Sequence, residues 1–160
     1  MNPRQLLIEP MEFLAPPRVL EGLAPELAHR RIDGTTHSIA ELVAHLAFWQ
    51  QWFFRRCQGV AEPMVQHAAD GWPAVAAGTW PAVLESYLAG LTRLTEWAEA
   101  AGERLEQPLA PAIEFPPLAE YTVRDALGHV ANHNAHHLGQ VILLRQLLGA
   151  WPPPAGSWTW

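Results

Sequence analysis

The sequence contains no lysine and only one cysteine, and each shortage narrows the chemistry that the protein can perform. The absence of lysine excludes catalysis through a Schiff base on a lysine amine. The single cysteine, Cys57, excludes an internal disulfide and a cysteine-rich zinc site. Any bound metal ion must therefore be held mainly by histidine, aspartate or glutamate side chains.

Charge and hydrophobicity exclude two further classes of partner. The net charge is -6, and the positive residues are all arginines scattered along the chain, so no basic surface for nucleic acid is expected. No apolar run reaches the roughly 18 residues that a membrane-spanning helix needs. The first residues also lack the basic and apolar stretches of a secretory signal. We therefore expect a cytoplasmic protein that binds neither a membrane nor nucleic acid.

The residues that are present predict one helical domain over residues 1–160. Hydrophobic residues make up 49% of the chain, which is typical of a globular protein. Apolar residues recur with a helical period in three long segments, over about 38–57, 79–101 and 122–148. Residues 3–28 are also helical in pattern, although their prolines must kink or divide this segment.

Local signals mark the ends of the long helices. Ser38 and Thr122 each begin a capping-box pattern, and glycines follow the three helices. The connections at 60–78 and 103–121 are rich in proline and glycine, and they are long for a bundle. No alternating strand pattern is found. Four helical units with two long connections predict an all-α fold, a four-helix bundle with long connections.

Four of the eight histidines lie close together in the last helix, at 129, 133, 136 and 137. Because a helix turns by about 100° per residue, His133 and His137 fall inside its apolar stripe, whereas His129 and His136 fall at the edge. His45 lies inside the apolar stripe of the helix at 38–57. The two helices therefore each turn histidine toward the core.

This pattern suggests a metal site made of three imidazoles. Residues four apart on a helix are neighbours, so His133 and His137 can reach the same metal ion. His45 from a facing helix would complete the set and leave coordination positions open, as in catalytic sites. A hydrogen-bonded core residue is an alternative for His45. His129 and His136 can line a pocket, donate hydrogen bonds to ligands or lie on the surface.

Two segments resemble a known family. The segment HNAHHLGQ at residues 133–140 and the segment HSIAELVAH at residues 37–45 are similar to signatures of the DinB/YfiT-like superfamily. The resemblance implies a four-helix bundle with one divalent metal ion bound by His45, His133 and His137. Many members have arginine where this chain has Leu138. Arg145 could replace that arginine only if its edge of the helix faces the pocket.

The resemblance also implies a type of reaction. Family members of known activity use the metal together with a low-molecular-weight thiol, as in bacillithiol and mycothiol transferases and the thiol-dependent maleylpyruvate isomerase. We therefore favour a metal-dependent thiol transferase or related hydrolase that acts on a small thiol and an electrophile. Zinc or nickel is the expected metal, although three imidazoles also suit copper or iron. The alternatives are a non-catalytic metal-binding stress-response or sensor protein, and a structural bundle whose histidines make only hydrogen bonds.

Several neighbours of the expected site are candidates for supporting roles. Glu41 lies one turn before His45 and could accept the proton on its non-ligating nitrogen, although the capping box alone explains this glutamate. Trp49, Trp52 and His129 could line a pocket beside the metal. Core packing is an alternative explanation for the two tryptophans.

The aromatic segment at 151–160 is expected to pack on the bundle or on a partner subunit. Since tryptophan is enriched at interfaces and family members are often dimers, we expect a homodimer.

Overall fold

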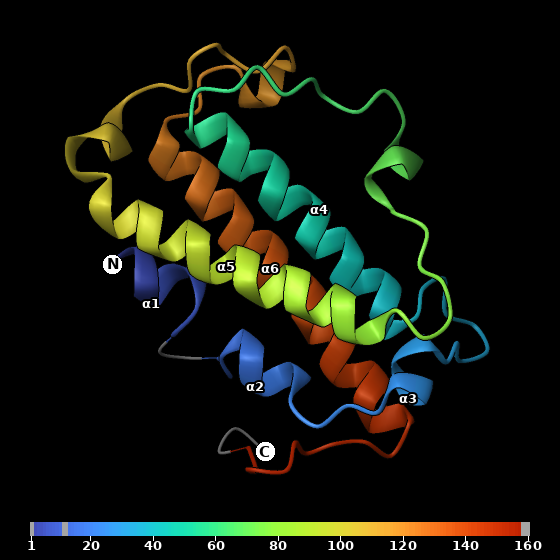
Figure 1. The fold of residues 1–160 in the computed structure, drawn as a ribbon. Coiled ribbons are helices and arrows are strands. Elements are labelled where there is room, and N and C mark those ends of the chain that lie inside the picture. The colour runs from blue at the N-terminus through green and yellow to red at the C-terminus, as the bar shows by residue number, and fades with distance from the viewer. Residues whose placement is uncertain (1, 11–12, 158–160) are drawn as a thin grey trace.

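The computed structural model describes residues 2–10 and 13–157, and these residues form helices and connecting segments without a β-strand. The all-α prediction is therefore confirmed for the described part of the chain. Figure 1 shows three long helices and several short ones. The α-helices are α1 (Pro3–Leu7), α2 (Pro16–Leu20), α3 (Pro25–His29), α4 (Ile39–Cys57), α5 (Trp80–Ala100) and α6 (Val123–Leu147), and the short 3-10 helices are η1 (Ala68–Gly71), η2 (Gly102–Glu106) and η3 (Pro116–Leu118).

The long helices begin and end within about one residue of the positions expected from sequence. Complete capping boxes start α4 and α6. The side chains of Ser38 and Thr122 accept hydrogen bonds from the backbone three residues on, and the carboxylates of Glu41 and Asp125 accept hydrogen bonds from the backbone N–H groups of Ser38 and Thr122. The helix α5 begins differently, because Thr79 makes no capping hydrogen bond and its hydroxyl donates to the carbonyl of Ala76 instead.

The N-terminal helical segment is divided, as its prolines require. Each of the short helices α1, α2 and α3 carries proline in its first turn. The helix α4 packs against both α5 and α6. The short helices α1 and α2 also pack against both α5 and α6. Short helices thus take the place of a fourth long helix, which the described residues do not contain.

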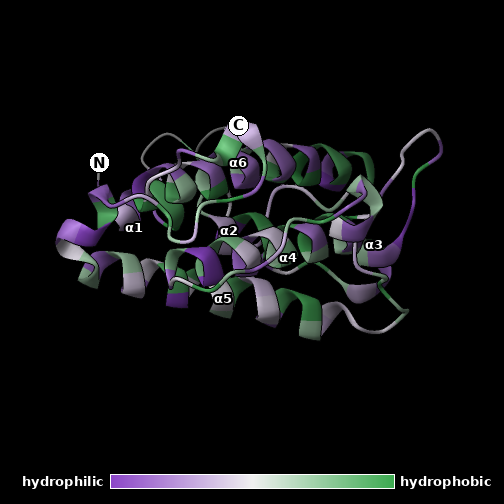
Figure 2. Cartoon of the chain, turned by 90° about the horizontal axis from the view of Figure 1, so that it is seen from above, coloured by the Kyte–Doolittle hydropathy of each residue, from purple (hydrophilic) through white to green (hydrophobic). Residues whose placement is uncertain are grey.

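The core lies between the long helices and is built from their apolar faces. Hydrophobic and hydrophilic residues alternate along α5 and α6 in Figure 2, as expected of helices with one buried face. Val43, Leu46, Leu91, Leu94 and Val141 are completely buried. These residues come from all three long helices, so the core joins α4, α5 and α6 and fixes their relative positions.

Arg145 holds the N-terminal segment against α6 and does not face a pocket. Its side chain is only 1% exposed, and its guanidinium donates hydrogen bonds to the carbonyls of Val19, Glu21 and Ala150. The condition under which Arg145 could replace the family's arginine is therefore not met. A buried guanidinium that donates hydrogen bonds to three backbone carbonyls stabilises the positions of the segments that carry them.

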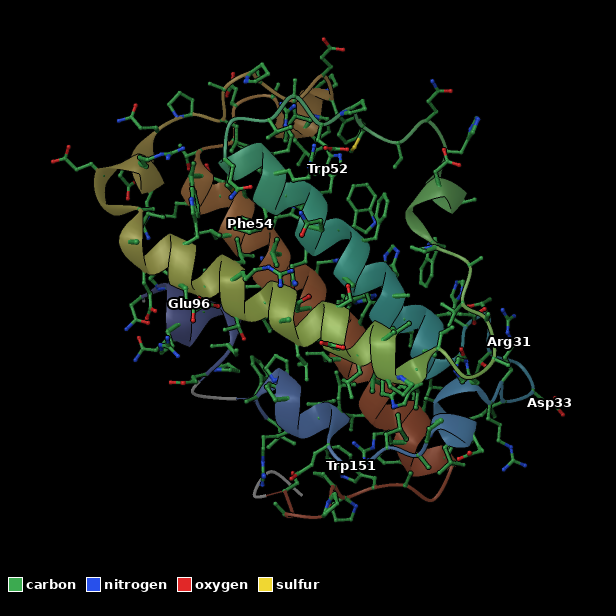
Figure 3. All side chains as sticks on the ribbon, viewed as in Figure 1. Arg31, Asp33, Trp52, Phe54, Glu96 and Trp151 are labelled. Carbon is green, nitrogen blue, oxygen red and sulfur yellow. The ribbon has the colours of Figure 1, made fainter. Side chains whose placement is uncertain are left out.

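The C-terminal segment packs back on the helices as far as it is described. The Trp151 ring lies 5.6 Å from the guanidinium carbon of Arg145, beside the end of α6 (Figure 3). Pro153 is buried, and Pro154 lies against Gly22. The remaining aromatic residues of this segment, at 158–160, lie outside the described residues.

The connection between α4 and α5 positions the candidate site. It leaves the end of α4, runs alongside that helix and forms η1 before it reaches α5 (Figure 1). Gly71, at the end of η1, packs on α4 so closely that an added Cβ would lie 2.8 Å from the Trp49 indole nitrogen. The segment from Asp70 to Trp72 is therefore held against the histidine-bearing face of α4. Among the described helices, none is both long and apolar enough to cross a bilayer.

Candidate metal centre

The fold brings His45, His133 and His137 together, although His45 lies on α4 and the other two lie on α6. One ring nitrogen from each of the three lies within 4.8 Å of the others. The Nε2 atoms of His45 and His133 are 3.1 Å apart. The ring centroids of the three pairs are separated by 4.6 to 4.9 Å. The packing of α4 on α6 therefore assembles a cluster that neither helix could form alone.

The donor set fits a divalent transition metal. Two histidine nitrogens bound to one zinc ion at about 2.0–2.1 Å in tetrahedral geometry lie roughly 3.3 Å apart. The distance of 3.1 Å between the Nε2 atoms of His45 and His133 is near that value, and all three ligand atoms lie within 4.8 Å of one another. Three nitrogen ligands leave at least one position open to a substrate or water.

Hydrogen bonds orient two of the three imidazoles with Nε2 toward the cluster. The Nδ1 of His45 lies 2.6 Å from the carbonyl oxygen of Gly71, and the Nδ1 of His137 lies 2.7 Å from the Oε1 of Gln140. Since both oxygens accept hydrogen bonds, we assign the ring proton of each histidine to Nδ1. The Nε2 atoms of His45 and His137 then carry the lone pairs that can bind a metal ion.

Burial keeps the three imidazoles neutral near pH 7. Desolvation, with a smaller effect of neighbouring histidines, lowers the pKa of His133 to about 3. The same two causes lower the pKa of His45 to about 4, although its hydrogen bond with Gly71 opposes the shift. Desolvation also lowers the pKa of His137, although its hydrogen bond with Gln140 opposes this shift. Neutral imidazole is the form that binds metal, so no proton has to be removed before binding at neutral pH.

An aromatic stack covers one side of the cluster. The Trp72 indole lies parallel to the His45 ring at 3.8 Å and parallel to the His37 ring, on its other face, at 3.7 Å. The Trp72 ring is also 5.9 Å from that of His137. Trp72 therefore restricts the rotation of His45 and shields the cluster from water.

The sequence reasoning missed the residues that orient the ligands. Gln140 could have been found, because it lies three residues after His137 on the same helix face. Gly71 and Trp72 carry no such signal, because they lie outside the long helices and reach His45 through tertiary packing alone. His37 also lies outside these helices and stacks on the other face of Trp72.

The two other histidines of α6 lie outside the cluster of three. His129 is half-buried, its Nδ1 lies 3.2 Å from the Tyr121 hydroxyl, and its ring is 6.5 Å from that of His133. His136 is exposed and contacts Gln140. His129 can line the approach to the cluster, whereas His136 faces solvent.

The tryptophans of α4 lie in different places. The Trp49 ring meets the His45 ring edge-on at 6.5 Å and packs under Gly71, so Trp49 lines the site. Trp52 is 4% exposed and donates a hydrogen bond from its indole nitrogen to the carbonyl of Pro63. Trp52 therefore anchors the connection after α4.

Glu41 does not support His45. Its carboxylate completes the capping box at Ser38 and pairs with Arg31, while the Gly71 carbonyl accepts the His45 proton. The suggestion that Glu41 could accept that proton is therefore wrong. Leu138, at the position where many family members carry arginine, is buried in the core.

Comparison with known proteins agrees with the sequence signatures and the geometry. The model of the DinB superfamily matches residues 17–141, which include all three clustered histidines. No curated protein matches the chain. Because the matched region covers most of the sequence, the chain belongs to the DinB superfamily.

Proposed function

We propose that the protein is a metal-dependent transferase or related hydrolase that joins a small thiol, or water, to an electrophilic substrate. The observation that carries this proposal is the convergence of nitrogens from three neutral imidazoles, two of which are oriented by the hydrogen bonds that they donate to Gly71 and Gln140. A closed structural site needs four protein ligands, whereas three ligands suit a catalytic site. Membership of a superfamily of metal-binding proteins supports the same conclusion.

A divalent cation held by His45, His133 and His137 would lower the pKa of a bound thiol or water molecule and provide a nucleophile near neutral pH. The chain's own residues prepare the site for this chemistry. Trp72 covers one side of it, which strengthens electrostatic interactions by excluding water. The pair of His129 and Tyr121 offers polar atoms beside His133 for holding a substrate.

The first test is metal binding by the protein without a polyhistidine tag. We expect one zinc or nickel ion per chain, measured by elemental analysis and calorimetric titration. His137→Ala should abolish tight binding because it removes one of three ligands, and His133→Ala should do the same. His136→Ala is the matched control, since it removes an exposed neighbouring imidazole. Equal loss of binding in His136→Ala would contradict the assigned ligand set.

The second test is turnover. Bacillithiol, mycothiol, glutathione and coenzyme A are each incubated with monochlorobimane, and conjugation is followed by fluorescence in the metal-loaded protein and in His137→Ala. We expect conjugation with at least one thiol that depends on the metal and on His137. Tight metal binding without turnover with any thiol or with a hydrolysable substrate would favour a metal-binding sensor instead.

A further inference from the structure

A cavity lies on another side of α4 from the histidine cluster. It has a volume of about 880 Å³ and is formed between α4, the start of α5 and the connection between them. Its walls are mainly apolar and include Ala47, Phe48, Met64, Val75 and Val83. None of the three clustered histidines lines it. Its volume falls within the range of about 300–1,000 Å³ that is typical of small-molecule sites.

The charged groups that line this cavity are one ion pair and one carboxylate. The Arg55 guanidinium forms an ion pair with Glu62. The Asp70 carboxylate accepts a hydrogen bond from the backbone of His67. The other polar side chains in its lining are neutral: Gln51, Gln66 and Ser86. An anionic ligand would therefore lose water without gaining a free positive group, whereas an uncharged ligand avoids this loss.

We propose that this cavity between α4, α5 and residues 62–75 binds an uncharged, mostly apolar small molecule at a site separate from the metal centre. Apolar walls supply the binding energy by burying hydrophobic surface, and the three neutral polar groups allow one or two hydrogen bonds to the ligand.

The cavity and the histidine cluster share one wall. Asp70, Pro73 and Ala74 line the cavity, while Gly71 and Trp72, between them in sequence, contact His45. A ligand in the cavity stabilises the conformation of this segment that orients His45. Its binding should therefore tighten metal binding, and metal should tighten ligand binding by the same factor. This coupling rests on the proposed metal centre, whereas the cavity as a binding site does not.

Binding is tested with the uncharged fluorescent probe N-phenyl-1-naphthylamine on the metal-free full chain. We expect saturable binding of one probe per chain. Ala82→Phe and Ser86→Phe place an aromatic ring at the exposed mouth of the cavity, and each should weaken binding by about tenfold or more. Ala100→Phe is the matched control, because this exposed alanine lies at the other end of α5.

Circular dichroism is used to check that each variant is folded. The two substitutions at exposed positions provide independent tests of the same site. No saturable binding, or equal binding by the wild type and both cavity variants, would overturn the proposal. The anionic probe 8-anilinonaphthalene-1-sulfonate should bind about tenfold more weakly or worse, and equal affinity would overturn the assigned ligand class.

The coupling is tested by titrating zinc with and without saturating N-phenyl-1-naphthylamine. We expect zinc affinity to rise by about fivefold or more in the wild type and to stay unchanged in Ser86→Phe. Unchanged or weakened zinc affinity in the wild type would overturn the coupling. A protein that binds the probe but no zinc would refute the proposed metal centre and leave the cavity site supported.

Discussion

The metal-free protein should lose stability as the pH falls below the ordinary pKa of histidine, and His45 should account for a measurable share of this loss. Desolvation lowers the pKa of His45 from 6.5 to about 4 in the folded protein. The unfolded chain therefore binds more protons than the folded chain between about pH 6.5 and pH 4. The free energy of unfolding must then decrease as the pH falls through this window.

The size of the effect follows from the two pKa values. When the pH falls from 7 to 5, a histidine with the pKa shift of His45 lowers the free energy of unfolding by about 2 kcal/mol. Little solvent reaches this residue, which is only 6% exposed, so its imidazolium is poorly solvated in the folded protein. His133, whose pKa is lowered to about 3, contributes in the same direction.

The assay is urea denaturation of chelator-treated protein at pH 7, 6 and 5, followed by circular dichroism. We expect the wild type to lose about 2 kcal/mol more stability between pH 7 and pH 5 than His45→Gln, which cannot titrate. His67→Gln removes an exposed histidine and should keep the wild-type pH dependence. If His45→Gln loses as much stability as the wild type, the buried neutral state inferred for His45 is refuted.

Three substitutions away from the ligands test how the fold supports the centre. Gly71→Ala should lower the free energy of unfolding by about 1–3 kcal/mol and weaken zinc binding, because its Cβ would lie 2.8 Å from the Trp49 indole nitrogen. Unchanged denaturation and titration curves would contradict this close packing. Gln140→Leu should weaken zinc binding by about tenfold or more in calorimetry, because it removes the oxygen that orients His137, and unchanged affinity would refute that role. Arg145→Met should lower the free energy of unfolding by about 2–4 kcal/mol because three carbonyls lose their donor, and a change below about 1 kcal/mol would show that these bonds contribute little.

The sequence was sufficient to predict the long helices and the clustered histidines. Helical periodicity placed α4, α5 and α6 to within about one residue, and the phase of α6 separated His133 and His137 from His136. These features depend on local spacing, which the sequence shows directly. The helical phase also turned His45 toward the core, and the resemblance of two short segments to one family indicated the same three histidines.

The support of the centre could not be predicted because it depends on tertiary packing. The Gly71 carbonyl reaches His45 from an irregular connection, and the Trp72 ring inserts between two histidines that are separated in sequence. The Glu41 carboxylate belongs to the capping box of α4, so its position one turn before His45 wrongly suggested a hydrogen bond to that histidine. The role of Arg145 was equally hidden, because its partners are backbone carbonyls rather than acidic side chains.

The division of the three ligands between two helices has a consequence for the order of assembly. His133 and His137 become neighbours as soon as α6 forms, but His45 lies 88 residues before His133 and joins them only when α4 packs on α6. During synthesis, the chain must therefore grow past residue 137 before a three-nitrogen site can exist. Tight metal capture should then be one of the last events in the maturation of the protein, and a metal already bound would hold α4 and α6 together against later unfolding.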